Sequence, residues 1–415
     1  MLTKKSKRVA VTGIGLITPL GTGIEANWRA LMEGKSGVSH LERDDLGDLP
    51  VQFAGNVSDF EATDYLDRKM ARQYDRYIHF SIAAGDLALA DAGLQSEDLP
   101  KDRTAVLVGS GMGGVTTFYD NAVLMHTRGH RRISPFFVPA TISNMASGLM
   151  TIRYGTRAAN FAIVSACATG AHSVGEGFRM IQNGEADVAI AGGAEAANIP
   201  VCIAGFAAAK ALSLRNDDPA AASRPFDADR DGFVMAEGAG VLILEREEAA
   251  IARKAKIYGY LCGIGYSSDA YHPTAPSADG AGAALAMQHA IDDAGISARD
   301  IGYINAHSTS TQVGDKAEVA AIRTVLGSAV NDVAVSSTKS MTGHLLGAAG
   351  SVEAAYALLA LQNGQLPPTI NLQNVDPECE LNHIANRPRE AKIEYALSNA
   401  FGFGGTNSAL VFCKA

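Results

Sequence analysis

The chain has 415 residues, of which 47% are hydrophobic and 19% are charged. Such a chain can bury a large core, which excludes a disordered protein and a small domain held together by disulfides. It carries 35 Lys and Arg residues against 44 Asp and Glu residues, a formal net charge of −9. Proteins that bind nucleic acids or membrane surfaces normally carry the opposite sign, so neither partner is expected.

The N-terminus joins a basic segment, residues 4–8, to the apolar sequence VAVTGIGLITPLG. Polar residues, glycines and a proline interrupt that apolar run, so we predict a basic tail leading into a β-strand rather than a secretion signal. No stretch approaches about 20 uninterrupted apolar residues, the length that spans a bilayer. A soluble, cytoplasmic protein is therefore expected.

The five cysteines are an odd number, are widely spaced and form no CxxC motif. This pattern predicts reduced thiols, with no disulfide framework and no metal site. The residues are Cys167, Cys202, Cys262, Cys379 and Cys413.

An internal repeat divides the chain. Residues 88–99 (ALADAGLQSEDL) match residues 290–301 (AIDDAGISARDI), 202 positions later. Each segment is predicted to end a helix, at Gly93 and at Gly295, and each precedes an apolar strand, at 104–111 and at 302–308.

Further segments extend the repeat. VAVTGIG (9–15) matches YLCGIG (260–265), and FAIVSACATG (161–170) aligns with DVAVSSTKSM (332–341), which places Cys167 on Thr338. We predict two similar α/β halves about a pseudo-twofold axis, with parallel sheets covered by helices. The first half carries two insertions, one before the repeated helix and one at roughly 112–160.

Two motifs carry little weight. GSGMGG (109–114) satisfies G-x-G-x-x-G, but no acidic residue stands about 20 positions later, so a glycine turn is favoured over a dinucleotide site. His126 and His130 lack the HExxH glutamate, and Gly129 interrupts their helix, which favours a solvated basic segment.

Cys167 is the strongest candidate nucleophile. The sequence FAIVSACATGAHSVGEGFRMIQNG predicts a strand, a tight turn and a helix, with the sulfur at the helix N-terminus. There the free N–H groups and the helix dipole are expected to lower the pKa of the thiol. From this evidence alone a buried structural cysteine is equally probable.

His307 and His344 follow strands that the repeat would bring near the same axis. Acyl transfer to a thiolate requires donors and proton carriers nearby, which histidines supply. The glycine loop FGFGGTN (401–407) can offer backbone N–H groups to an oxyanion.

Together these residues resemble the β-ketoacyl-[acyl carrier protein] synthase II family, condensing enzymes with a thiolase-like fold. The resemblance covers essentially the whole chain and rests on nine segments. These are ISPFFVP (133–139), SACATG (165–170), ADVAIAGGAE (186–195), SRPFDADRDGFVMAEGAG (223–240), SSDAYH (267–272), NAHSTST (305–311), GDKAE (314–318), SSTKSMTGHLLGAAG (336–350) and FGFGGTN (401–407). The chain departs from the family in having Ser308 for Gly, and Ala168 and Thr169 where Thr and Ser are common.

The resemblance implies an α/β, five-layered αβαβα fold built from two pseudo-twofold-related βαβαβαββ halves. Residues 1–255 would carry the nucleophilic cysteine and two insertions, and residues 256–415 the two histidines. The implied activity is decarboxylative Claisen condensation of malonyl-[acyl carrier protein] with an acyl group held on Cys167. It yields 3-oxoacyl-[acyl carrier protein] in fatty acid elongation, without cofactor or metal. A ketosynthase of a specialised lipid or polyketide pathway, or synthase I-type specificity, is the alternative.

The resemblance also implies roles for individual residues, and a homodimer that binds acyl carrier protein. The catalytic residues would be Cys167, His307, His344 and Lys339, with the backbone of Cys167 and Phe403 as oxyanion hole. Met112, Phe206 and Phe403 would gate the acyl pocket, and Glu353, Asp315 and Glu318 would support the site. The carrier protein, which is typically acidic, would dock on Arg68, Lys69, Arg72, Arg131, Arg132 and Lys210.

Related enzymes are distinguished by single residues. A degradative thiolase would need a second cysteine in the C-terminal glycine loop, which reads GFGGTN here. A type III initiating synthase would carry Asn in place of His344, and a non-catalytic chain-length partner would lack Cys167. The interpretation as a nicotinamide dehydrogenase rests only on the motif GSGMGG, and no NAD(H) binding is expected.

Overall fold

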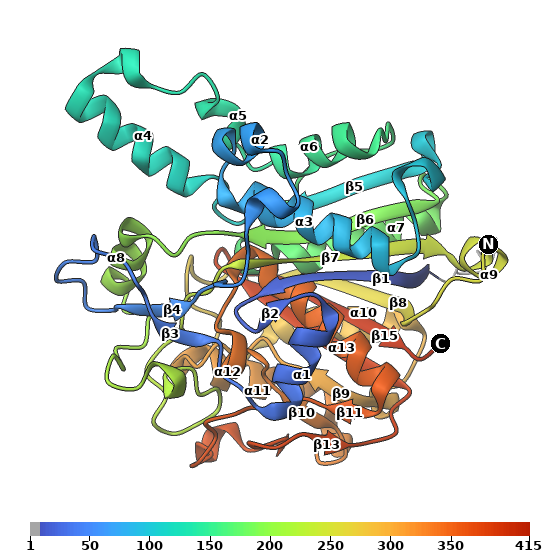
Figure 1. The fold of residues 1–415 in the computed structure, drawn as a ribbon. Coiled ribbons are helices and arrows are strands. Elements are labelled where there is room, and N and C mark those ends of the chain that lie inside the picture. The colour runs from blue at the N-terminus through green and yellow to red at the C-terminus, as the bar shows by residue number, and fades with distance from the viewer. Residues whose placement is uncertain (1–8) are drawn as a thin grey trace.

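The computed structural model describes residues 9–415, so the basic tail predicted at 4–8 lies outside the described residues. Its centre is a mixed, 11-stranded sheet in the order β12-β10-β9-β14-β15-β8-β1-β7-β6-β5, with β2 paired to β1 (Figure 1). The strands are β1 (Val9–Thr18), β2 (Gly21–Thr22), β5 (Thr104–Gly109), β6 (Val188–Glu195), β7 (Gly238–Arg246), β8 (Gly259–Ser268), β9 (Ile301–Asn305), β10 (Ala334–Ser336), β12 (Asn382–His383), β14 (Tyr395–Gly402) and β15 (Thr406–Cys413).

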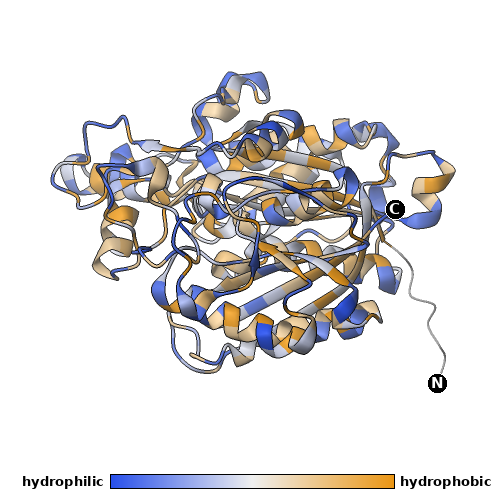
Figure 2. Cartoon of the chain, turned by 90° about the horizontal axis from the view of Figure 1, so that it is seen from below, coloured by the Kyte–Doolittle hydropathy of each residue, from blue (hydrophilic) through white to orange (hydrophobic). Residues whose placement is uncertain are grey.

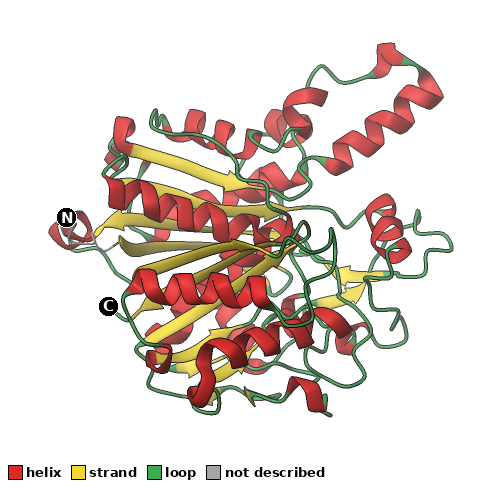
Figure 3. Cartoon of the chain, turned by 180° about the vertical axis from the view of Figure 1, so that it is seen from behind, coloured by secondary structure: helices red, strands yellow, loops and turns green. Residues whose placement is uncertain are grey.

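Helices cover both faces of this sheet (Figure 3). They are α1 (Ile24–Glu33), α2 (Arg68–Gln73), α3 (Arg76–Asp91), α4 (Val115–Arg128), α5 (Phe137–Thr141), α6 (Met145–Tyr154), α7 (Thr169–Asn183), α8 (Pro200–Ala208), α9 (Glu247–Ala252), α10 (Ala281–Ala294), α11 (Gln312–Leu326), α12 (Lys339–Thr342) and α13 (Ala349–Asn363). Two small sheets pair β3 (Val38–His40) with β4 (Phe53–Gly55), and β11 (Gln365–Leu366) with β13 (Arg389–Glu390). Between residues 9 and 415, no helix is long and apolar enough to cross a bilayer.

The predicted repeat is visible in how each half packs its repeated helix, α3 or α10, on its first strand. A Cβ atom added to Gly15 would lie 1.8 Å from the Ala84 carbonyl oxygen, and one added to Gly265 would lie 1.9 Å from that of Ala286. Only glycine allows this approach of α3 to β1 and of α10 to β8. The repeat therefore reflects one packing arrangement used twice.

Matching aspartates anchor the same helices. Asp91 in α3 accepts a hydrogen bond from the backbone N–H of Ile14 at 2.9 Å, and Asp293 in α10 accepts one from Ile264 at 3.0 Å. Both residues belong to the matched segments. The fold is therefore thiolase-like, with two halves related by a pseudo-twofold axis as predicted.

The layers follow from the helix contacts. Helices α3 and α6 pack on the first-half strands, α10 and α11 lie over the second half, and α7 and α13 pack against each other and against strands of both halves. The two inner helices cross closely because a Cβ on Gly170 would lie 2.8 Å from the Ser351 nitrogen, and one on Gly350 would lie 2.8 Å from that of Ala171. In Figure 2, many residues of the outer loops are hydrophilic (blue), whereas the central strands contain more hydrophobic (orange) and neutral (white) residues.

Strand direction differs from the prediction of parallel sheets. β5–β6, β9–β14, β9–β10 and β10–β12 are parallel, whereas β1–β7, β6–β7, β8–β15, β14–β15 and β1–β8 are antiparallel. In the second half, β14 and β15 follow one another through a tight turn, without the helical crossover that a parallel pair needs. In the first half, β6 and β7 are also antiparallel, although the segment 196–237, which contains α8, connects them. The strand predicted before Cys167 is reduced to one bridge, between Asn160 and Val106.

The repeat around the nucleophile differs from the predicted alignment. Helix α7 and helix α13 each follow a 3₁₀ turn, η5 (Ala166–Ala168) and η9 (Leu346–Ala348), whose first residues have φ of 49° and 48°. Cys167 therefore corresponds to Gly347, not to Thr338. The alignment failed because α12 is an extra turn of helix that the first half lacks.

The insertions are also more numerous than predicted. The first-half elements β2 to α2 separate β1 from α3, and residues 112–160 form α4, which projects from the body (Figure 1), together with α5 and α6. A further long segment, 196–237, connects β6 to β7, where the second half has a tight turn between β14 and β15.

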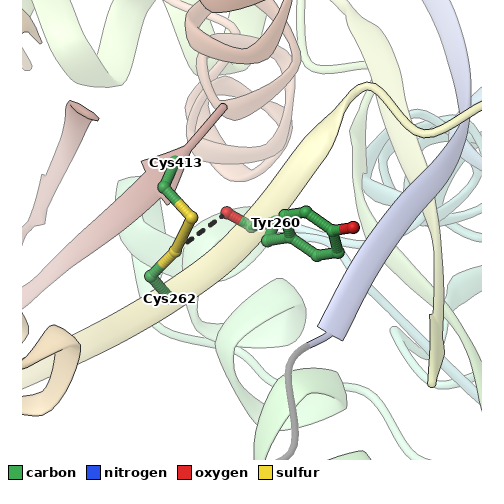
Figure 4. The surroundings of a disulfide bond; sticks show 3 residues. All are labelled: Tyr260, Cys262 and Cys413. Atoms are coloured by element: carbon green, nitrogen blue, oxygen red, sulfur yellow. Dashed lines mark hydrogen bonds between the residues drawn. A yellow bond between two sulfur atoms is a disulfide. The ribbon is translucent and has the colours of Figure 1, made fainter. Parts of the chain in front are cut away.

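One cysteine prediction is wrong. A disulfide joins Cys262 in β8 to Cys413 at the end of β15, with 6.3 Å between their Cα atoms (Figure 4). The two residues are 151 positions apart in sequence, but β8 and β15 are antiparallel neighbours, so the sheet brings them together. Cys167, Cys202 and Cys379 are free, as predicted.

Candidate active site

A cavity of about 470 Å³ receives side chains from both halves of the fold. The residues predicted for catalysis and gating that line it are Met112, Cys167, Phe206, His307, His344 and Phe403, together with Lys210 and Glu318. Lys339, Glu353 and Asp315 are buried behind this lining. In the part of the chain that the structure describes, no three His, Cys, Asp or Glu side chains are grouped to hold a metal ion.

Cys167 lies in turn η5, directly before helix α7. The backbone N–H of Phe403 donates a hydrogen bond to its sulfur. A Cβ atom on Gly402 would lie 2.7 Å from the Ser165 carbonyl oxygen and 3.2 Å from the Cys167 nitrogen, so glycine allows the loop to approach the nucleophile. The glycine loop and the nucleophile therefore share one end of the cavity.

The pKa of Cys167 differs from the prediction. Burial raises the pKa of the Cys167 thiol to about 12, an effect that nearby Lys339 opposes and the Glu195 carboxylate reinforces. Desolvation therefore outweighs the helix N-terminus that the sequence indicated. The resting thiol is protonated at neutral pH and must lose its proton during the reaction.

His307 and His344 face each other, with ring centroids 5.4 Å apart and planes at 84°. The backbone N–H of His344 donates to the Val234 carbonyl at 2.7 Å, and the edge of its ring meets Phe233. Burial, reinforced by the charge of Lys339, holds the pKa of both histidines well below its usual range. Both rings are therefore neutral at pH 7, and each can donate one N–H hydrogen bond.

Lys339 and Glu353 form a buried ion pair, with 1% and 2% of their surfaces exposed. Lys339 begins α12 and Glu353 lies in α13. Burial raises the pKa of Glu353 to about 7, although Lys339 opposes the shift. The pair places a positive charge beside the cavity, where it acts on both histidines and on Cys167.

Glu318 holds the backbone of the His307 loop. Its Oε1 accepts from the N–H of His307 and from Asn399 Nδ2, both at 2.9 Å. Its Oε2 accepts from the Ser308 N–H at 2.6 Å and from the Ser308 hydroxyl at 2.7 Å. Ser308, which replaces the family's usual glycine, thus adds a hydrogen bond to the support of this loop.

Asp315 supports the same loop from further away. It accepts from the backbone N–H of Phe226 at 2.9 Å and of Ser310 at 3.2 Å, and lies 3.5 Å from Arg230. Burial raises its pKa to about 6, against the opposing charge of Arg230. Asp315 does not line the cavity.

The predicted gate residues lie along one wall. The Phe206 ring centroid lies 6.4 Å from that of Phe403, with the two rings tilted at 54°. It lies 5.3 Å from that of Phe233, in an edge-to-face contact. Met112 is 39% exposed and Phe403 is 40% exposed, although both line the cavity. Side chains on this wall could therefore control which acyl groups enter.

The basic residues predicted for carrier docking fall into separate groups. Lys210 lines the cavity. Arg68, Lys69 and Arg72 lie on α2, and Arg131 and Arg132 lie in the 3₁₀ turn η4 (His130–Arg132) beyond α4. None of these five arginines and lysines lines the cavity.

Two parts of the site were missed. Glu195 and Asp269 both line the cavity, and Asp269 ties its loop to the glycine loop by accepting from Asn407 Nδ2 at 2.6 Å. The signal for Glu195 was present, because a charged residue ends the otherwise apolar strand VAIAGGAE. Asp269 gave no comparable signal, since acidic residues are common in loops.

Comparison with known proteins agrees with this geometry. The β-ketoacyl synthase N-terminal domain matches residues 6–250, and the β-ketoacyl synthase C-terminal domain matches residues 258–373. The chain is 49% identical over 414 residues to a 3-oxoacyl-[acyl-carrier-protein] synthase 2 of Synechocystis, covering 100% of each chain.

Solved structures extend the likeness to the fold. A β-ketoacyl synthase from Burkholderia phymatum has a TM-score of 0.91 at 35% identity, with 99% of this chain and 100% of that one covered. A type II PKS ketosynthase, in complex with its acyl-carrier protein and bound to the hexaketide, has a TM-score of 0.92 at 34% identity with the same coverage. The chain therefore belongs to the β-ketoacyl synthase family.

Proposed function

We propose that this protein condenses malonyl-[acyl carrier protein] with an acyl group held on Cys167 and releases 3-oxoacyl-[acyl carrier protein] in fatty acid elongation. The observation that carries the proposal is one cavity holding Cys167, the neutral pair His307 and His344, and a backbone N–H of Phe403. The 49% identity to a 3-oxoacyl-[acyl-carrier-protein] synthase 2 favours fatty acid elongation over a specialised polyketide pathway.

In the first half-reaction, the Cys167 sulfur attacks the thioester carbonyl of an acyl-carrier. The backbone N–H groups of Cys167 and Phe403 stabilise the oxyanion, since preorganised donors act strongly in a site from which water is excluded. The C–S bond to the carrier breaks, and the carrier thiol leaves with the proton that Cys167 loses. The acyl group is then bonded to Cys167.

In the second half-reaction, malonyl-carrier binds with its thioester carbonyl against His307 and His344. Their N–H groups stabilise the enolate that forms as the C–C bond to the carboxylate breaks and carbon dioxide leaves. The enolate carbon attacks the acyl-Cys167 carbonyl, and the collapsing intermediate expels the Cys167 thiolate, which takes up one proton from solvent. Lys339 and Glu353 would support both steps electrostatically, and Glu318 and Asp315 would position the His307 loop.

The proposal is tested by incubating purified protein with malonyl-carrier and acyl-carriers of graded chain length. We expect carbon dioxide and one 3-oxoacyl-carrier, two carbons longer than the primer, for several primers. Carbon dioxide without a condensed product, or a product extended repeatedly without reduction, would contradict fatty acid elongation and, in the second case, favour polyketide synthesis.

We further propose that the boundary between the two halves lies between residues 255 and 256.

We also propose that the protein is a cytoplasmic homodimer. Large apolar side chains are exposed on α4, on α5 and directly after it, and in the segment before Cys167. They include Phe118, Val123, Met125, Val138, Ile142, Phe161 and Val164. An exposed apolar area of this kind is typical of an interface, and replacing Phe118 and Met125 by Asp should shift the mass in analytical ultracentrifugation to that of a monomer.

Carrier docking depends on local positive charge, because this chain is acidic overall. Replacing Arg131 and Arg132 by Glu should raise the KM for acyl-carrier about tenfold at low ionic strength, and less in high salt, which screens exposed charges. The matched control reverses the exposed Arg299 and Arg387. If KM at low salt is the same in both variants, turn η4 is not part of the docking surface.

Met112 is proposed to gate the acyl end of the cavity. Methionine is unbranched and adapts among rotamers, so long chains can pass, whereas the rigid ring of a Met112→Phe variant should obstruct them. We expect activity on long acyl-carriers to fall about tenfold or more, while short ones are spared. Ile251→Phe, at an exposed position on α9 outside the cavity, is the control. An equal loss at every length with a lower Tm would mean that Met112 only fills space.

A further inference from the structure

Glu195 is a buried carboxylate that the proposed reaction does not use. It ends β6, borders the cavity, and none of its surface is exposed. Its Oε1 accepts from the Ser110 hydroxyl at 2.7 Å and the Met112 N–H at 3.2 Å. Its Oε2 accepts from the N–H groups of Gly111 at 2.9 Å and Gly347 at 3.0 Å. Four uncharged donors, three of them backbone groups, thus surround the carboxylate.

The pseudo-twofold axis shows what this position corresponds to. In each half the first, last and penultimate strands lie side by side in register, so equivalent residues can be traced across the sheet. Starting from Gly15 and Gly265, the equivalent pairs are Val241 with Ala409, Gly192 with Asn399, and Glu195 with Gly402. Glu195 therefore occupies the place in the first half that begins the glycine loop in the second.

The donors that meet at the two places also correspond. Gly402 lies against the nitrogen of Cys167, which we propose as an oxyanion donor. Glu195 accepts from the nitrogen of Gly347, the counterpart of Cys167. The Glu195 carboxyl group thus occupies the position beside Gly347 that corresponds to the oxyanion hole beside Cys167.

The hydrogen bonds of Glu195 also tie together two segments that border the acyl end of the cavity. A Cβ atom on Gly347 would lie 2.4 Å from the Gly111 nitrogen, so the two backbones touch without room for a side chain. Gly347 lies three residues after His344, and Gly111 precedes Met112. The carboxylate is the acceptor that both backbones share.

We propose that Glu195 is a positioning residue that sets which acyl chain lengths the cavity accepts, by holding Ser110, Gly111 and Met112 against Gly347. This inference rests on the proposed function. When Glu195 fixes the backbones of Gly111 and Gly347, the backbone of Met112 is fixed as well, and so is the place at the acyl end of the cavity that its side chain occupies. Without the carboxylate, buried N–H groups lose their acceptor, and the wall must rearrange to find others.

Glu195 also has an electrostatic effect that a purely structural residue would not have. Burial is the main cause that raises the pKa of Cys167, and the charges of Glu195 and Glu353 raise it further, whereas the charge of Lys339 lowers it. Burial raises the pKa of Glu195 itself to about 7, although its four donors oppose the shift. Removing the charge should therefore make Cys167 easier to ionise.

The test uses Glu195→Gln, which keeps the size but replaces one acceptor oxygen by an NH₂ group, and Glu195→Asp, which keeps the charge. For Glu195→Gln we expect kcat/KM on long acyl-carriers to change about tenfold and on short ones less than twofold. The pH profile of Cys167 alkylation by iodoacetamide should move to lower pH in Glu195→Gln and stay close to wild type in Glu195→Asp.

Glu245→Gln is the control, because Glu245 is a buried carboxylate on the adjacent strand β7 that does not line the cavity. The proposal is overturned if Glu195→Gln loses activity equally at all lengths, with a Tm decrease like that of Glu245→Gln, or if alkylation of Cys167 is unchanged. If Glu195→Gln does not fold, an unaltered chain-length profile in Glu195→Asp overturns it. Wild-type protein that forms no 3-oxoacyl product would instead refute the proposed function, while the alkylation profile still tests the charge.

Discussion

Cys167→Ala is expected to abolish acyl transfer to the protein and to lower condensation by at least about 10⁴-fold. The substitution removes the only atom at the N-terminal end of α7 that can form a thioester, while it changes little else in the packing. Intact-protein mass spectrometry after incubation with acyl-carrier should show one acyl adduct on the wild type and none on the variant.

The matched controls are Cys202→Ala and Cys379→Ala, which remove the other free cysteines. Both are buried and neither lines the cavity, so each variant should keep the adduct. An adduct retained by Cys167→Ala would refute the assignment of the nucleophile. The pKa of the Cys167 thiol, about 12, leads to a further expectation. Because the thiolate is the reactive form, Cys167 of the unliganded protein should react slowly with iodoacetamide at pH 7.

The architecture could be predicted because the chain encodes it twice. The matched residues at 88–99 and 290–301 include Asp91 and Asp293, which anchor equivalent helices in the structure. A repeat of this kind reports packing contacts directly, so it indicates the fold more reliably than strand propensity does. Strand direction was predicted less well, since it depends on how the strands connect.

The candidate site was predictable where motifs surround it, as at Cys167, His307 and His344. The sequence could not show how deeply each of these side chains is buried. The pKa of Cys167 is raised because desolvation outweighs a helix N-terminus, and that balance depends on residues far away in sequence. The Cys262–Cys413 disulfide was missed for the same reason, since the two strands are brought together only by the folded sheet.

His307→Ala and His344→Ala should separate the two half-reactions. Both variants keep Cys167 and the Phe403 N–H, so acyl loading is expected to stay within a few-fold of wild type. Decarboxylation of malonyl-carrier should fall about 10²–10³-fold, because each ring supplies one hydrogen-bond donor to the developing enolate. Loading is measured by mass spectrometry and decarboxylation by carbon dioxide release.

Asparagine provides a control at each position, since its amide N–H can replace part of the hydrogen bonding of the imidazole. Activity in His307→Asn or His344→Asn that exceeds the corresponding alanine variant would support a donor role. Release of carbon dioxide at the wild-type rate by either alanine variant would remove that histidine from the mechanism.

The pH dependence tests whether both rings act in the neutral form. Burial and the charge of Lys339 hold the pKa of both histidines low, so the neutral rings persist as the pH falls below 6.5, the ordinary value. Lys339→Met removes one of these two causes and should raise both pKa values, so protonation occurs at higher pH. The acid limb of decarboxylation should therefore move to higher pH in Lys339→Met and stay in place in Lys339→Arg, which keeps the charge beside Glu353. Decarboxylation that instead falls as the pH rises, with an alkaline limb that moves to higher pH in Lys339→Met, would mean that the protonated imidazolium is the active form.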